Sequence, residues 1–312
     1  MLLSPLGAAY ALSVRLRQVR SRPYRPNACV ICVGNLTAGG SGKTPVALAI
    51  AEILAPRGKT VFLSRGYGGR LTGPLVVDPT RHTAHEIGDE PLLLAKRGIA
   101  IVARNRRDGA RLADELNADF IVMDDGFQNF SIEKDLSLLV VDAETGFGNG
   151  KIIPAGPLRE PVLSGCARAD AIILVGDGNP KLPAFRGQMI RAKLVPNSPE
   201  SLRGKRVMAF AAIGRPQKFF DMLKSVGAEV TCTMNFADHH VFTTAELSQL
   251  KKRAQAAGAV LVTTEKDFAR IPAPARTGIT PVAVRLEFGD RAAVLALLAR
   301  LLPAQKAAVH AG

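Results

Sequence analysis

The sequence predicts an α/β protein whose larger part is a doubly wound, mostly parallel sheet and whose smaller part is a second α/β domain. Two patterns carry this prediction. Short apolar strands alternate with helical stretches along most of the chain, and a Pro- and Gly-rich stretch, 176–187, separates two such series. With 312 residues, of which 47% are hydrophobic, the chain is long enough for two domains and can bury a sizeable core.

The first series consists of six apolar strands with helical stretches among them. Its first strand leads through a glycine-rich loop into a helix expected at 45–54. Because helical crossovers join parallel strands, ligands are expected at the carboxyl ends of these strands. The six strands are expected at 28–34, 60–66, 99–104, 119–125, 136–142 and 170–176.

The second series predicts the smaller domain. We expect a first domain over residues 1–185 and a smaller α/β domain over residues 186–289 that closes over the ligand site. A last helix is expected from about Arg291 to Leu302, and the segment 290–312 is a candidate to return to the first domain and complete it. The second series comprises strands at 206–214, 228–236, 259–267 and 280–288, with helices at 217–226 and 244–257.

The loop after the first strand, VGNLTAGGSGKTP at 33–45, is typical of a phosphate-binding P-loop. A strand, a glycine-rich turn and a helix N-terminus direct successive backbone N–H groups at phosphate oxygens. Lys43 can bridge the β- and γ-phosphates of a nucleotide, and Thr44 can ligate Mg²⁺. Thr37 stands where the usual loop opens with Gly, but this leaves the charged chemistry intact. The expected nucleotide contacts are Thr37, Ala38, Gly39, Gly40, Ser41, Gly42, Lys43 and Thr44.

A pair of acids supplies a partner for that loop. The apolar run 120–123 delivers Asp124 and Asp125 to the carboxyl end of a strand, and Gly126 then turns the chain. Two adjacent carboxylates repel each other unless a cation lies near them, and Mg²⁺ is the natural candidate. The alternative is an acidic turn with a helix-capping aspartate.

Positive charge is concentrated in the N-terminal region. The net charge of the chain is +14, and its first 51 residues contain no Asp or Glu. The arginines are too many for a bilayer span, and the basic leader and cleavage site of a secretory signal are missing. We therefore expect an interfacial helix on an anionic membrane surface, with a helix docked on its own core as the alternative. The apolar residues expected at the acyl boundary are Leu6, Tyr10, Val14 and Leu16.

The four cysteines are too few and too scattered for a disulfide framework. Cys29 and Cys32 form a C-x-x-C, but they lie inside an apolar strand and no second ligand pair matches them. Packing in a reducing cytosol is the expected role.

Several short strings together resemble one family, the tetraacyldisaccharide 4'-kinases of Gram-negative bacteria, in the order in which the family has them. The family loop also opens with Thr, which accounts for Thr37. The strings are VGNLTAGGSGKTP, SRGYGG at 64–69, GDEP at 88–91, DDGFQ at 124–128, PAGPLREP at 154–161, IGRPQKFF at 213–220, FADHH at 236–240 and TTEKD at 263–267.

The resemblance implies a peripheral or monotopic enzyme on the cytoplasmic face of the bacterial inner membrane. It would transfer the γ-phosphate of ATP, with Mg²⁺, to the 4'-hydroxyl of tetraacyldisaccharide 1-phosphate, a step of lipid A biosynthesis. The expected partners are thus this lipid and an anionic membrane surface, with no nucleic acid and no obligate protein partner.

Transfer to a hydroxyl needs a group that accepts its proton while cations hold the phosphate charge. The resemblance implies that Asp89 is this base, that His239 assists it from the second domain, and that Lys43 is the catalytic cation. A histidine can orient a carboxylate and carry the proton onward. The alternatives are a helix cap for Asp89 and a structural or solvent-facing role for His239.

Arginines in the basic motifs, which include ARNRR at 103–107, can grip phosphates of ATP or lipid through forked hydrogen bonds. We expect this of Arg65, Arg104 and Arg159, with solvated surface arginines as the alternative. One departure from the family is Asn129, which replaces the His that commonly follows DDGFQ and cannot be protonated.

Two other classes of protein fit the sequence less well than the kinase. A regulatory P-loop ATPase of the partition type has a Lys before its paired glycines, where this chain has Ala38, and a GTPase needs [NT]-K-x-D, which TEKD does not match. A nucleic-acid-binding module fits the charge, but only 5% of residues are aromatic and none is Trp, so stacking platforms are scarce.

Overall fold

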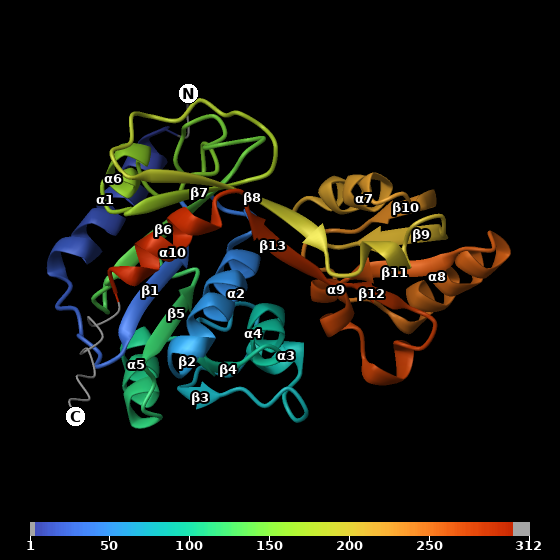
Figure 1. Cartoon of the computed structure of the whole chain (residues 1–312), viewed down its shortest axis with the longest axis horizontal. Coiled ribbons are helices and arrows are strands. Elements are labelled where there is room, and N and C mark those ends of the chain that lie inside the picture. Colours follow the sequence, from blue (N-terminus) through green and yellow to red (C-terminus); the bar gives the residue numbers. More distant parts are fainter. Residues whose placement is uncertain (1–3, 302–312) are drawn as a thin grey trace, which may run out of the picture.

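The computed structural model of the protein describes residues 4–301 and contains two sheets (Figure 1). The larger sheet has nine strands in the spatial order β13 (Val284–Phe288), β8 (Gln188–Pro196), β7 (Ala171–Val175), β6 (Leu136–Asp142), β1 (Cys29–Gly34), β5 (Phe120–Asp124), β2 (Thr60–Ser64), β4 (Ile99–Val102) and β3 (Leu75–Val76). The smaller sheet has the order β10 (Glu229–Asn235), β9 (Arg206–Ala211), β11 (Val260–Thr264) and β12 (Thr280–Val282). All neighbouring strands are parallel except β3 with β4 and β13 with β8, as the predicted fold class requires.

Helices cover both faces of the larger sheet. One face packs against α2 (Lys43–Leu54), α4 (Asp89–Ala95) and α10 (Arg291–Ala299). The other face packs against α5 (Arg106–Glu115) and α6 (Val162–Cys166). The smaller sheet lies between α7 (Pro216–Ser225) and α8 (Thr244–Ala256). Short elements complete the chain: α3 (Ala84–Ile87), α9 (Glu265–Arg270) and the 3₁₀ turns Ala55–Arg57, Pro199–Ser201 and Ala273–Ala275.

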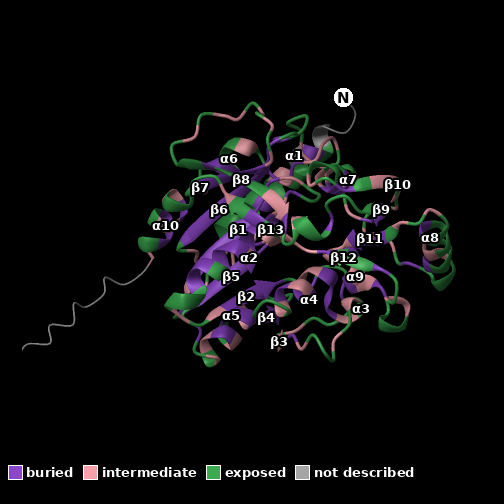
Figure 2. Cartoon of the chain, turned by 45° about the vertical axis from the view of Figure 1, so that its right-hand side comes forward, coloured by how far each residue is buried: buried purple, intermediate pink, exposed green. Residues whose placement is uncertain are grey.

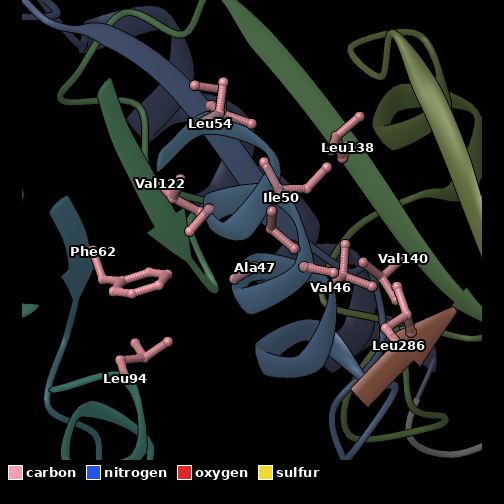
Figure 3. Close-up of a cluster of buried hydrophobic side chains, with 14 of the residues drawn as sticks. Val46, Ala47, Ile50, Leu54, Phe62, Leu94, Val122, Leu138, Val140 and Leu286 are labelled. Carbon is pink, nitrogen blue, oxygen red and sulfur yellow. The ribbon is translucent and has the colours of Figure 1, made fainter. Parts of the chain in front are cut away.

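Helix α2 is held in place by one apolar face. Val46, Ala47, Ile50 and Leu54 recur at helical spacing and are fully buried against the central strands (Figure 3). Among the strands beneath, β5 and β6 are buried over their whole length, and Figure 2 shows this burial in the middle of the larger sheet. This packing fixes the N-terminal end of α2, where the glycine-rich loop ends.

The N-terminal helix α1 (Ser4–Arg20) both docks on the protein and presents apolar residues to solvent. Val14 was predicted to face a membrane, and this was wrong, because its side chain is only 3% exposed. The other three predicted residues are exposed, and so are two further ones, which gives an outer set of Leu6, Tyr10, Leu12, Leu16 and Val19. Within residues 4–301, no helix combines the length and the apolar character that a bilayer crossing requires.

The boundary between the two parts differs from the prediction of 186–289. β8 was not predicted at all, and the expected strand 280–288 is two strands, β12 and β13, divided at Ala283. Both β8 and β13 belong to the larger sheet, so the smaller unit is confined to 197–283. The expected last helix is α10, which packs on the larger sheet through Leu297 and Leu298, while 302–312 lie outside the described residues.

Candidate active site

The site lies at the carboxyl edge of the larger sheet, where the central strand β1 ends at Gly34. β1 pairs in parallel with β5 on one side and with β6 on the other, and Val33 is in register with Asp124. β6 ends at Asp142. Because parallel strands present their carboxyl ends at one edge, the loop after β1 emerges between these two acids.

The glycine-rich loop is shaped from inside by Asn35, which sequence analysis did not single out. Its side chain is fully buried, and Nδ2 donates hydrogen bonds to Ser41 Oγ at 2.9 Å and Thr37 Oγ1 at 3.3 Å. Gly39 and Gly42 have φ angles of 108° and 87°, which residues with a side chain rarely adopt. The sequence shows only an Asn between an apolar strand and a glycine run, and its burial is visible only in the structure.

Thr44 and Asp124 meet directly beneath the loop. Thr44 Oγ1 donates a hydrogen bond to Asp124 Oδ2 at 2.8 Å, whereas Asp124 Oδ1 is buried and has no hydrogen-bond partner within residues 4–301. Burial, followed by the nearby charge of Glu90, raises the pKa of Asp124 to about 7. A buried carboxylate oxygen without a partner beside a hydroxyl fits Mg²⁺, which is commonly held by one or two carboxylates together with substrate phosphates.

Asp125, the second acid of the pair, contacts two cationic side chains. Arg159 Nη1 donates to both of its carboxylate oxygens, at 2.9 and 3.0 Å, and Lys43 Nζ lies 3.8 Å from Oδ1. Burial would raise the pKa of Asp125, but the charges of Lys43 and Arg159 outweigh it and hold the pKa below its ordinary value. In this structure Asp125 is therefore paired with two cations, and its partner in Arg159 is the single nitrogen Nη1.

Asp89 and His239 come together from the two units, as their predicted roles require. Asp89 begins α4 and is only 4% exposed, and its Oδ2 lies 3.2 Å from His239 Nδ1, at an angle that falls short of a hydrogen bond. Burial would raise the pKa of Asp89, but His239, Lys266 and Arg270 outweigh it and hold the pKa below its ordinary value. The carboxylate is thus ionised at neutral pH.

His239 has a left-handed backbone, with a φ angle of 60°. Non-glycine residues in this region are uncommon, and such strain concentrates at functional sites. The ring is one-third exposed and packs edge-on against Tyr67, with 5.8 Å between ring centroids. His239 is therefore both anchored and reachable from solvent.

The other predicted residues take part in none of these contacts. Arg65 is exposed, and Arg104, also exposed, donates through Nη2 to the carbonyl oxygen of Gly69 at 3.2 Å. Asn129 Oδ1 accepts hydrogen bonds from the backbone N–H and the hydroxyl of Ser131, at 3.2 and 3.0 Å. Asn129 thus shapes the turn after DDGFQ.

A second contact between the units, which sequence analysis missed, is centred on Asp142. Its carboxylate lies 2.9 Å from Arg215 Nη1 and 2.7 Å from Lys218 Nζ, both in the segment that begins α7. In the same segment, a Cβ placed on Gly214 would lie 3.5 Å from the backbone nitrogen of Gly40. The smaller unit therefore reaches the glycine-rich loop itself.

The sequence and the fold are both similar to those of known proteins. A sequence profile of the family described as tetraacyldisaccharide-1-P 4'-kinase matches residues 1–303. The chain belongs to this family. Curated tetraacyldisaccharide 4'-kinases include those of Rhodospirillum centenum, 50% identical over 96% of this chain and 91% of the relative, and Rhodopseudomonas palustris, 47% identical over 100% and 95%.

A solved structure of a tetraacyldisaccharide 4'-kinase is also similar. LpxK from Aquifex aeolicus in complex with ATP is 26% identical, with a TM-score of 0.77 over 97% of this chain and 100% of that one. These matches confirm the predicted family, fold class and enzyme class, an ATP-dependent 4'-kinase of lipid A biosynthesis. They favour the kinase over the regulatory switch and the nucleic-acid-binding module.

The ion pairs of Asp142 predict a pH-dependent contribution to the stability of this family member. Burial would raise the pKa of Asp142, but Lys218 and Arg215 outweigh it and lower the pKa. A carboxyl group with a lowered pKa stabilises the fold above its unfolded-state pKa, and this is lost as pH falls through the folded-state value. We therefore expect Asp142→Asn to lower the free energy of unfolding at pH 7, and the difference from wild type to shrink below a pH of about 4.

Denaturant unfolding of both proteins across this pH range measures that difference. Asp177→Asn is the matched control, because Asp177 is 78% exposed in its ion pair with Lys193 and should change little. A difference that does not vary with pH would contradict the prediction.

Proposed function

We propose that this chain transfers the γ-phosphate of ATP to the 4'-hydroxyl of tetraacyldisaccharide 1-phosphate at the cytoplasmic face of the inner membrane, with Mg²⁺ bound at Thr44 and Asp124. The observation that carries the proposal is the contact of Asp89 with His239 across the two units, beside a phosphate-binding loop. Family membership adds the identity of the acceptor, because the curated relatives are named for that substrate.

Each residue of the site has a distinct task in this transfer. The loop amides and Lys43 bind the phosphates, and Arg159 and Asp125 keep the Lys43 ammonium in place. Mg²⁺ would offset the negative charge of the phosphates and orient them. Asp89, ionised and buried, accepts the proton of the attacking hydroxyl, and His239 orients its carboxylate.

The acceptor carries acyl chains, so the enzyme must work at a membrane surface. The outer apolar set of α1 and the arginines that follow one another from Arg15 to Arg25 provide both components of interfacial binding: apolar area for the acyl boundary and positive charge for anionic lipid. We infer that the helix keeps this docked orientation on the membrane, because Val14 fixes its inner face.

The assignment of the loop is tested by Lys43→Ala. We expect phosphate transfer to be abolished while the protein remains folded, since the lost ammonium would act on the phosphate whose charge changes most in the transition state. The assay incubates purified protein with radiolabelled ATP, Mg²⁺ and the detergent-solubilised disaccharide 1-phosphate and separates the lipid products. Lys59→Ala is the control, because it removes an exposed lysine just before β2, at the amino ends of the parallel strands. Near-normal turnover by folded Lys43→Ala would refute the loop assignment.

The pairing of Asp89 with His239 is tested by a double-mutant cycle. If the two residues act as a unit, Asp89→Ala and His239→Ala each lower kcat far more than they raise the KM for ATP, and the double variant is little worse than the poorer single one. The expected loss on removing the base is on the order of 10²- to 10⁴-fold. His240→Ala is the matched control, because His240 contacts Glu246 instead of Asp89. Independent, multiplicative losses would mean that His239 does not work through Asp89.

Membrane binding is tested by deleting residues 1–22 and, separately, by replacing exposed Leu12, Leu16 and Val19 with Ser. Both changes should weaken sedimentation with anionic vesicles, and only the deletion should remove the salt-sensitive part, because the substitutions keep the arginines. Val241→Ser, which alters a side chain of the smaller unit that is 78% exposed, is the control. Undiminished sedimentation of the truncated protein would rule out the interfacial helix.

A further inference from the structure

Asp89 lies among cationic groups that the smaller unit supplies, and one of them has no explanation in the proposed chemistry. The side chain of Arg270, the last residue of α9, is only 8% exposed. Its Nε lies 3.7 Å from Asp89 Oδ2. Within residues 4–301, neither of these two atoms has a hydrogen-bond partner. A buried guanidinium needs a paired carboxylate, and Arg270 already has one in Asp267, so its additional approach to Asp89 needs a reason.

The far side of the Arg270 guanidinium is firmly anchored. Nη2 donates a hydrogen bond to the carbonyl oxygen of Ala212 at 2.9 Å and also bonds Asp267. Asp267 is fully buried, and its other oxygen accepts hydrogen bonds from the backbone N–H of Ala212 at 3.0 Å and from Thr264 Oγ1 at 2.7 Å. The direction in which Nε points is therefore fixed by a network of satisfied bonds.

The same carbonyl also holds His239. The backbone N–H of His239 donates to the oxygen of Ala212 at 3.1 Å, so this oxygen accepts from both His239 and Arg270. His239 has the left-handed backbone described above, which must be held by its surroundings. Arg270 thus touches one member of the Asp89–His239 pair through Nε and shares with the other a single acceptor.

Lys266 is the second cation of α9 near Asp89, but its contacts differ. Its Nζ lies 3.1 Å from Glu90 Oε1 and 3.8 Å from Asp89 Oδ2, so Glu90 is the nearer partner. Burial would lower the pKa of Lys266, but Glu90 and Asp89 outweigh it and raise the pKa. Lys266 thus serves mainly the junction of α4 with α9, whereas Arg270 is placed on the reacting pair.

We propose that Arg270 is a positioning residue for phosphate transfer: it holds Asp89 against His239 so that the base is complete only when α9 lies on α4. The inference rests on the proposed role of Asp89. Ala269, the neighbour of Arg270, packs in the core of the larger unit together with α4. When α9 packs on α4, Arg270 also orients the carboxylate of Asp89. Asp89 can therefore accept a proton only while the smaller unit is docked on the larger one.

The test measures kcat, the KM for ATP and thermal unfolding for Arg270→Met, Arg270→Lys and the control Arg97→Ala. Arg97 forms an exposed pair with Glu265 across the same α4–α9 contact at 3.4 Å without touching Asp89. We expect Arg270→Met to lower kcat by about 10- to 100-fold, as small misplacements of catalytic groups do. The KM for ATP should not change, Arg270→Lys should recover part of kcat, and Arg97→Ala should match wild type.

A second cycle separates this inference from the proposed function. If Arg270 acts through Asp89, adding Arg270→Met to Asp89→Asn costs nothing further. A wild-type kcat in Arg270→Met, or the same loss in both backgrounds, would overturn the inference alone. If Asp89→Asn itself kept its kcat, the proposed base would be wrong. If Arg270→Met fails to fold, Arg270→Gln, which keeps donors for Ala212 without the charge, takes its place in both comparisons.

Discussion

The position of β1 between β5 and β6 in a parallel sheet is the constraint on which the site depends. It brings the loop after Gly34 out between the ends of two strands that both terminate in aspartate, Asp124 and Asp142. The two acids then serve opposite purposes. Asp124 faces Thr44 beneath the loop, while Asp142 faces Arg215 and Lys218 of the smaller unit. The same edge of the sheet therefore carries the phosphate site and the acid that binds the smaller unit.

The two units meet through opposite charges on both sides of that loop. The larger unit contributes acids, Asp89 and Glu90 on one side and Asp142 on the other, and the smaller unit contributes the cations. The pair of Arg97 with Glu265 has the opposite polarity. Complementary pairs at several places favour a single relative orientation of the units, because a shifted contact would leave buried charges unpaired. The contact between the two units therefore contains both the ion pairs of the proposed base Asp89 and the structural ion pairs of Asp142.

Sequence patterns were sufficient for elements with strong local signals and insufficient for contacts between distant residues. The helix predicted at 244–257 is α8, whose start is marked by a capping box of Thr243 and Glu246. β8 was missed because its exposed and buried residues alternate irregularly after a Pro-rich stretch, and Ala283 gives no sign that the strands around it belong to different sheets.

The site shows the same division. The loop, Thr44 and Asp124 follow from local spacing, since a strand must lead to a loop and then to a helix. The resemblance to the kinase family supplied Asp89 and His239, which are 150 residues apart and could not be paired by any local rule. The engagement of Asp125 by Arg159 and the buried role of Asn35 depend on side-chain packing, which is not encoded in any short stretch of sequence.

The pairing of β8 with β13 has a topological consequence. Val284 lies opposite Pro196, and the backbone N–H of Asn197 donates to the carbonyl oxygen of Ala283 at 2.9 Å, so the chain leaves the larger sheet and re-enters it at adjacent points. The smaller unit is thus an insertion at the tip of a β-hairpin. A tight turn in place of 197–283 would leave all nine strands of the larger sheet connected in the same order. The larger sheet, which carries the phosphate-binding loop, is thus continuous without the smaller unit. The unit that carries His239 and Arg270 is inserted between two strands at the edge of that sheet.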